Sequence, residues 1–244
     1  MAEFHLQIAG QTAAVRALFE STPHHFSRYL SQSAPDFSVT VTEADLRFEQ
    51  AQLDEEALRE GFKRRIFTDP FLERAAIQRK FAEHLLCHDT LLLHASAVAV
   101  DGKAYLFTGK SGTGKSTHTR FWLEAFGSRA LMINDDKPFL RFTPDAVWVC
   151  GSPWSGKHGL DTNVSIPLAG ICLLQRGSEN RIRSAAPEQL LPRLLHESYQ
   201  PQDPHLAERS RALAGQLSHR VRLWCMECTR SPEAAQIAHR AMSE

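Results

Sequence analysis

The sequence lacks a net charge, because 28 lysines and arginines balance 28 aspartates and glutamates. A protein that neutralises nucleic-acid phosphates usually has a basic excess or a basic face, so this balance argues against DNA or RNA as a partner. The balance is uneven along the chain: acidic side chains outnumber basic ones over residues 1–60, and the remainder has a basic excess. The basic part is therefore where a phosphate-binding motif is expected.

Long hydrophobic runs and cysteines are also scarce. No apolar stretch approaches the roughly 20 residues of a membrane-spanning helix, and residues 1–10 lack the basic-then-apolar order of an export signal. The five cysteines are an odd number in a chain that is large enough to be stabilised by burial, so a disulfide framework is not expected. These features predict a cytoplasmic protein with reduced thiols and no membrane contact.

The length of 244 residues, 43% of them hydrophobic, fits a globular core with a smaller appendage. Residues 1–85 are predicted to form an α+β region, in which 4–10 and 37–50 are strand-like and 12–21 is helix-like. The pattern turns helical from about residue 54 to residue 88. One face of that helix is predicted to be an apolar stripe of Leu72, Ala75, Ala76, Phe81 and Leu85.

Residues 86–244 show the alternation of strands and helices that is typical of an α/β domain. Residues 91–100 and 104–109 are predicted to be adjacent strands joined by a turn at Asp101 and Gly102. Further strands are predicted at 130–135, 146–151, 169–176 and 220–228, and helices at 116–126, 187–199 and 232–242.

The most informative motif is Gly109–Thr117, GKSGTGKST, which fits G-x-x-x-x-G-K-[ST] between a predicted strand and a predicted helix. The glycines allow a tight turn, and the loop amides and the helix N-terminus attract phosphate oxygens. The loop therefore predicts a nucleotide site that is made of Gly109, Lys110, Ser111, Gly112, Thr113, Gly114, Lys115, Ser116 and Thr117. Lys115 would reach the outer phosphates, and Ser116, or less readily Thr117, would bind Mg²⁺. The alternative is a flexible surface turn.

Asp135 and Asp136 end the predicted strand that follows this loop, where a metal-binding carboxylate is expected. Adjacent side chains on an extended chain point to opposite sides, so one carboxylate can bind Mg²⁺ while the other accepts a proton. The sequence does not decide which is which. The pair is alternatively a turn cap before Lys137 and Pro138.

His94 interrupts the apolar strand that precedes the loop. Such a histidine is often a hydrogen-bonded core residue, so its catalytic role depends on its neighbours.

The order of His94, the loop and the Asp135–Asp136 pair resembles the HPr serine kinase/phosphorylase family, and the loop also resembles that of phosphoenolpyruvate carboxykinase. The resemblance spans roughly residues 88–180. It implies an α/β fold with a phosphoenolpyruvate carboxykinase-like P-loop core (residues 86–244) and a smaller N-terminal α+β region (residues 1–85) of unassigned role. It also implies ATP and Mg²⁺ as cofactors, catalytic roles for Asp135, Asp136, His94 and Lys115, and the formation of oligomers.

Residues 150–163, CGSPWSGKHGLDTN, depart from the HPr enzymes and resemble instead the G-x-P-W-S-G-K stretch of HPr-kinase-like proteins. Lys157 is a candidate second cation for a transferring phosphoryl group, Ser155 and Gly156 could supply loop amides, and Asn163 could position a substrate. The alternative is a surface loop with an exposed lysine.

Two weaker clusters complete the candidates. Arg176, Arg181 and Arg183 either contact phosphate or an acidic acceptor or form a solvated turn. Cys225 and Cys228 have C-x-x-C spacing, but no second pair stands at metal-ligand spacing, and a buried strand is the better interpretation.

The leading hypothesis is an ATP- and Mg²⁺-dependent kinase that phosphorylates a hydroxyl group of a protein, a peptide or a small metabolite. The rival hypotheses are a P-loop NTPase and a nucleotide-binding regulatory module without a phosphoryl acceptor.

Overall fold

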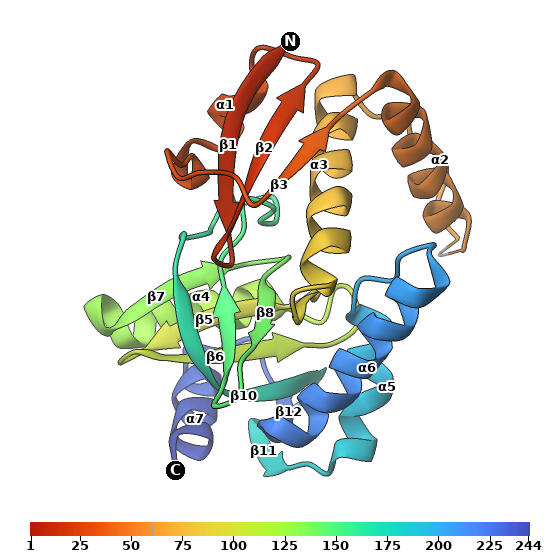
Figure 1. Ribbon diagram of the computed structural model, residues 1–244. Coiled ribbons are helices and arrows are strands. Elements are labelled where there is room, and N and C mark those ends of the chain that lie inside the picture. The colour runs from red at the N-terminus through yellow and green to blue at the C-terminus, as the bar shows by residue number, and fades with distance from the viewer. Residues whose placement is uncertain (60) are drawn as a thin grey trace. The chain divides into compact units, whose positions relative to one another are not determined.

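The computed structural model describes residues 1–59 and 61–244, which form two compact units, Met1–His84 and Leu85–Glu244 (Figure 1). Both units contain strands and helices, so the described chain has a mixed α/β architecture. No helix within the described ranges is both long enough and apolar enough to cross a membrane.

The first unit is built on a sheet whose described strands follow the order β1-β2-β3. Strands β1 and β2 are antiparallel, and β3 is parallel to β2. Its elements are β1 (Ala2–Ile8), β2 (Gln11–Ala17), α1 (Thr22–His25), a 3₁₀ turn (Ser27–Tyr29), β3 (Phe37–Thr40), α2 (Glu43–Arg59) and α3 (Asp69–Leu86), which ends two residues into the second unit.

The helix predicted at residues 12–21 is wrong, because most of that segment forms β2. Ala9 and Gly10 both have positive φ angles, 53° and 83°, as a two-residue hairpin turn requires. Pairing of β2 with β1 along its whole length then outweighs the helical preference of its alanines. The strand predicted at 37–50 is also too long, since Thr42 and Asp45 cap the start of α2 through mutual hydrogen bonds.

The helix predicted from residue 54 to residue 88 is interrupted, and Glu60 lies outside the described residues. Gly61 has a φ of 78°, and residues 62–68 have no regular structure before α3 begins. Of the predicted apolar stripe, Leu72, Ala76, Phe81 and Leu85 are buried and Ala75 is half-buried. Arg79 of α3 also binds α2, because its guanidinium donates to Glu49 Oε1 at 2.6 Å and to Asp45 Oδ1 at 2.8 Å.

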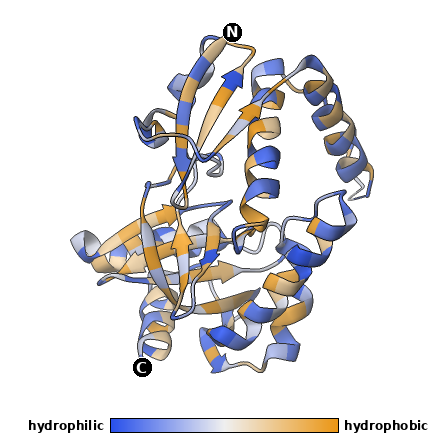
Figure 2. Cartoon of the chain, viewed as in Figure 1, coloured by the Kyte–Doolittle hydropathy of each residue, from blue (hydrophilic) through white to orange (hydrophobic). Residues whose placement is uncertain are grey.

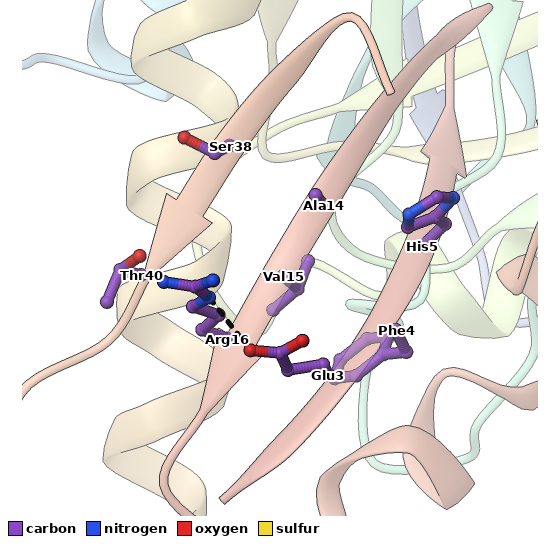
Figure 3. A pocket seen from close by; sticks show the side chains of 8 residues that line it. All are labelled: Glu3, Phe4, His5, Ala14, Val15, Arg16, Ser38 and Thr40. Carbon is purple, nitrogen blue, oxygen red and sulfur yellow. Dashed lines mark ion pairs between the residues drawn. The ribbon is translucent and has the colours of Figure 1, made fainter. Parts of the chain in front are cut away.

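One face of the three described strands carries an open depression of about 400 Å³. Figure 3 shows its lining side chains, which come from all three strands: Glu3, Phe4, His5, Ala14, Val15, Arg16, Ser38 and Thr40. None of these is a site residue predicted from the sequence.

The second unit is built on a sheet in which β4-β8-β9-β10-β6-β5-β7 are neighbours in that order and β12 lies between β10 and β11, as far as the structure is described. The strands are β4 (Thr90–Leu92), β5 (Ser96–Val100), β6 (Lys103–Thr108), β7 (Ala130–Asn134), β8 (Phe139–Phe142), β9 (Val147–Cys150), β10 (Ser165–Arg176), β11 (Arg181–Ser184) and β12 (Arg222–Cys228). The helices are α4 (Lys115–Phe126), a 3₁₀ turn (Gly127–Arg129), α5 (Pro187–Glu197), α6 (Pro204–Arg220) and α7 (Pro232–Ser243).

Helices cover both faces of this sheet (Figure 1). One core cluster combines strand side chains with α5 and α6, and the other combines them with α4 and α7. Neighbouring residues of β6 alternate between the clusters, since Leu106 belongs to the first and Phe107 to the second. The two-sided burial explains why β5 and β6 are hydrophobic along most of their length (Figure 2).

Most elements predicted in this unit form within a few residues of the expected bounds. The strand predicted at 91–100 is in fact two strands, because β4 pairs with β8 whereas β5 pairs with β6 and β7. The sequence did not predict β8, β11, α6 or the 3₁₀ turn at Gly127–Arg129. A signal for α6 was present, since Asp203 Oδ1 accepts the backbone N–H groups of His205 and Leu206 and Pro204 follows the cap.

Candidate functional site

Four strands of the second unit end at one edge of the sheet. Strands β6, β10 and β12 are parallel, and β7 has the same direction because β6 and β7 are both antiparallel to β5. The carboxyl ends of such strands are where α/β folds bind ligands. This topology brings the loop after β6 and the acid pair after β7 to the same edge.

The loop after β6 has the backbone that the sequence motif requires. Gly112 and Gly114 have φ angles of 74° and 109°, in the region that favours glycine. Gly109 has a φ of 155°, and a Cβ there would lie 2.8 Å from the carbonyl oxygen of Leu174. Helix α4 begins directly afterwards at Lys115, so loop amides and a helix N-terminus come together as a phosphate would need.

The rest of the motif is held close to this backbone. Thr113 donates from its amide and its hydroxyl to the carbonyl oxygen of Lys110, at 3.1 and 2.7 Å. Ser111 is exposed at the tip of the loop, whereas Ser116 and Thr117 are half-buried in the first turn of α4.

Lys115 is 8% exposed, which is unusual for a lysine. Its ammonium group donates to the carbonyl oxygen of Gly109 at 3.1 Å. Burial lowers the pKa of Lys115, although the negative charges of Glu197 and Asp136 oppose that effect. An anionic group beside the loop would compensate the buried charge.

The two aspartates have different surroundings, as alternation along an extended chain predicts. Asn134 shapes the turn, because its Oδ1 accepts the amides of Asp136 and Lys137 at 2.8 and 2.6 Å. Asp135 Oδ1 accepts from the hydroxyl of Ser96 at 2.9 Å. The hydroxyl of Ser96 also lies 2.7 Å from that of Thr119 in α4, so Asp135 is connected through Ser96 to the helix that follows the glycine-rich loop.

The same edge contains two buried oxygen atoms without a hydrogen-bond partner, Asp135 Oδ2 and the hydroxyl of Thr108. An orphaned buried carboxylate oxygen is costly unless a cation or a donor satisfies it. Oxygen is the ligand that Mg²⁺ prefers, and it binds such sites through one or two carboxylates plus substrate phosphates. These residues therefore fit a divalent cation, and Asp135, Asp136 and Ser116 are the groups that could hold it.

His94 does not lie on a strand, contrary to prediction, but in the connection between β4 and β5. The chain leaves the sheet there because the amides of His94 and Ala95 donate to the carbonyls of Glu197 and Asp136, at 2.8 and 3.0 Å. The imidazole lies between two carboxylates, with Nε2 3.2 Å from Asp136 Oδ1 and Nδ1 2.8 Å from Glu197 Oε2. Hydrogen bonds to Asp136 and then Glu197 raise the pKa of His94, while burial opposes them.

Glu197, at the end of α5, is a site residue that the sequence did not predict. It is 7% exposed, and its Oε1 accepts from Arg193 at 2.8 Å, so this carboxylate bonds to both His94 and Arg193. Burial alone would raise the pKa of Glu197, but hydrogen bonds from His94 and Arg193 lower it to about 2. The pKa of Asp136 is lowered overall. Burial by itself would raise it, but the hydrogen bond from His94 and the positive charge of Lys137 outweigh that effect. The site thus has two ionised carboxylates on either side of one imidazole.

The loop with the G-x-P-W-S-G-K sequence approaches the acid pair. A Cβ on Gly156 would lie 3.7 Å from Asp136 Cβ and 3.8 Å from Asp135 Oδ2. Ser155 donates from its hydroxyl to Asp161 Oδ2 at 2.7 Å, which closes the loop on itself. Lys157, which follows Gly156 in the sequence, is exposed. Asn163, at the end of the same loop, is also exposed.

The two weaker clusters separate in the structure. Arg176 donates to the carbonyl oxygen of Gly112 in the loop between β6 and α4. Arg181 and Arg183 instead lie exposed on β11. Arg183 donates to Gln189 Oε1 at 3.2 Å rather than to the loop. Cys225 and Cys228 both lie on β12, where Cys225 is buried and Cys228 is half-buried.

Comparison with known proteins gives distant structural similarity. No protein-family model matches the sequence, and no curated protein matches it. Among solved structures, the Hpr(Ser) kinase/phosphatase from Coxiella burnetii superposes with a TM-score of 0.39 at 12% sequence identity, over 62% of this chain and 92% of that chain.

Proposed function

We propose that this protein is an ATP- and Mg²⁺-dependent kinase with a phosphoenolpyruvate carboxykinase-like P-loop core, which transfers the γ-phosphate to a hydroxyl group. The observation that carries the proposal is the convergence at one sheet edge of a glycine-rich loop, a buried lysine, and an aspartate pair in which Asp136 contacts His94. A loop that only turned the chain would need neither the buried Lys115 nor the orphaned oxygen of Asp135.

The phosphate loop, Gly109–Thr117, would bind the β- and γ-phosphates through its amides, and Lys115 would stabilise the charge on the transferring group. Mg²⁺, when bound, would neutralise charge on the phosphate oxygens. Ser116 and Asp135 would hold the metal, since Asp135 Oδ2 is a buried carboxylate oxygen without a hydrogen-bond partner. Lys157, which follows Gly156 where the loop approaches the acid pair, would supply a second cation near the γ-phosphate.

Asp136 would accept the proton of the attacking hydroxyl as the new O–P bond forms and the bond to the leaving ADP breaks. Its hydrogen bond to His94 holds the carboxylate in place, and Glu197 orients the other side of the imidazole. In this division of roles, Asp135 would bind the metal and Asp136 would accept the proton.

The acceptor would be a serine of a protein or peptide, or a small hydroxylated metabolite. All of these present an O–H group that Asp136 can deprotonate, and none requires a basic nucleic-acid-binding face. A homo-oligomer is compatible with this chemistry.

The proposal predicts that Asp136→Asn and Lys115→Ala each reduce phosphoryl transfer by at least about a hundredfold while the protein stays folded. The measurement is transfer of label from [γ-³²P]ATP to protein or metabolite in a lysate with Mg²⁺, after thermal unfolding confirms that each variant is folded. Asp145→Asn and Lys103→Ala are matched controls, because both side chains are exposed and outside the site.

Unchanged transfer in both site variants would refute the assignment. Release of inorganic phosphate at the same rate with and without the lysate would instead identify an NTPase. Tight ATP binding without either reaction would identify a regulatory module.

A further inference from the structure

A second cavity of about 520 Å³ adjoins the phosphate loop. Its volume lies within the range of about 300–1,000 Å³ that is typical of small-molecule sites. The lining residues come from the phosphate loop, from α4 and from the ends of β10 and β12, and they include Gly112, Thr117, Phe121, Arg176, Thr229 and Arg230.

The position of the cavity follows from the sheet. Strands β6, β10 and β12 are parallel neighbours, so the phosphate loop and the segments after Arg176 and Cys228 leave the sheet at the same edge. Thr117 lines the cavity and Ser116 does not. The acid pair, His94 and Glu197 are also absent from the lining, so an acceptor hydroxyl bound here would not contact the proposed base.

The lining has the chemistry of a nucleoside site. Phe121 offers an aromatic face, and the guanidinium groups of Arg176 and Arg230 offer cationic planes on which a base can stack. Thr117 and Thr229 offer hydroxyl groups for a ribose. No aspartate or glutamate lines the cavity, so a ligand with a neighbouring phosphate meets no negative side chain there.

The wall of the cavity is held in place by hydrogen bonds. Asn180 Oδ1 accepts from the amide and the hydroxyl of Thr229, at 2.9 and 3.1 Å. The amide of Gly177 donates to the carbonyl of Cys228 at 3.1 Å, and Arg176 donates to the carbonyl of Gly112. The segments after β10 and β12 are thereby joined to each other and to the phosphate loop, so the cavity is formed before a ligand binds.

We propose that this cavity binds the nucleoside part of the nucleotide, with the base between Phe121 and Arg230 and the ribose toward Thr117. The inference rests on the proposed function, because it requires a nucleoside triphosphate whose phosphates occupy the adjacent loop. Arg176, which joins the loop to the cavity, lies where the α-phosphate would connect the two parts.

The test separates the nucleoside from the phosphates by comparing two ligands, ATP and inorganic tripolyphosphate, each with Mg²⁺. Arg230→Ala and Phe121→Leu are the variants, since Arg230 is exposed and leucine preserves the bulk of the half-buried Phe121. Each should weaken ATP binding, measured by titration calorimetry, by about tenfold, in keeping with the loss of one stacking contact. Tripolyphosphate binding should stay within twofold of the wild type.

Arg181→Ala is the matched control, because this arginine is exposed on β11 and does not line the cavity; both affinities should be unchanged. ATP binding within twofold of the wild type in both cavity variants would overturn the inference, as would an equal loss of affinity for both ligands. A wild-type protein that binds tripolyphosphate as tightly as ATP would also overturn it while leaving the phosphate loop intact. A wild-type protein that binds neither ligand would refute the proposed function itself.

Discussion

At the scale of single residues, the candidate site is distinguished by charged side chains whose burial costs desolvation free energy. The side chains of Asp135, Lys115 and Glu197 are all buried. Lys115 and Asp135 were predictable, because each stands in a local motif next to the residues that position it. Glu197 was not, because only the packing of α5 brings its carboxylate to His94, and no local pattern encodes that contact.

His118 is a further buried polar side chain near the loop, with 3% exposure. Its Nε2 accepts from the indole N–H of Trp122 at 3.1 Å, and its ring meets that of Phe107 edge to face. Burial lowers the pKa of His118 to about 4. The unfolded chain would therefore take up this proton at a higher pH than the folded protein does.

We expect the second unit to lose stability as the pH falls from about 6.5 toward 4, because protonation of His118 then favours the unfolded state. A histidine whose pKa is lower in the folded protein than in the unfolded chain contributes its full stability above the unfolded-state pKa. That contribution is lost as the pH falls toward the folded-state pKa. His118→Gln keeps an acceptor for Trp122, and the acid-induced loss should shrink by up to about 3 kcal/mol. Urea unfolding followed by tryptophan fluorescence at pH 7.5, 5.5 and 4.5 measures this, since all four tryptophans lie in the second unit.

His158→Gln is the control, because His158 is exposed and the variant should follow the wild type at every pH. An acid response of His118→Gln identical to that of the wild type would contradict the assignment.

At the scale of elements, turn and cap residues explain both successes and failures. The Asp101–Gly102 turn was predicted and forms with φ angles of 51° and 76°. The hairpin at Ala9 and Gly10 was missed, because the alanines that follow favour a helix until β1 pairs with them. Local preference decides an element only where no competing tertiary pairing exists.

Two glycines of the second unit should respond to alanine in opposite directions. Gly215 lies inside α6, and a Cβ added there would have no neighbouring atom within 4 Å, so Gly215→Ala should stabilise the protein by about 0.5–1 kcal/mol. Gly151 follows β9, and a Cβ there would lie 1.8 Å from the carbonyl oxygen of Thr162, so Gly151→Ala should destabilise it by at least about 2 kcal/mol. The free energy of unfolding in urea measures both changes, and the same sign for the two variants would contradict the packing described.

At the scale of the whole molecule, the chain is two compact units with different charge. The acidic excess lies in residues 1–60, within the first unit, and the site residues all lie in the second unit. The net charge of zero is therefore a cancellation between units rather than a property of the site. Backbone amides, which would hold the phosphates, do not enter a charge count at all.

The segment between α2 and α3 is the most exposed described stretch that carries several basic side chains. Residues 61–66 are exposed and without regular structure, and Lys63, Arg64 and Arg65 lie within them. We expect limited trypsin digestion to cut first after one of these three residues. Mass spectrometry of the early fragments measures this, with a variant that carries glutamine at all three positions as the control. A first cut within residues 85–244 would contradict the prediction.

The sequence by itself determined the glycine-rich loop, because Gly109–Thr117 encodes a turn with glycines at positive φ and a helix start within one short segment. It also placed the Asp135–Asp136 pair at the end of a strand. Only the tertiary structure decided that β6 and β7 end at the same edge, that Glu197 reaches His94, and that the ends of β10 and β12 form a cavity beside the loop. The physical reason is range: backbone conformation follows from neighbouring residues, whereas these contacts depend on which strands pair and which helices pack across them.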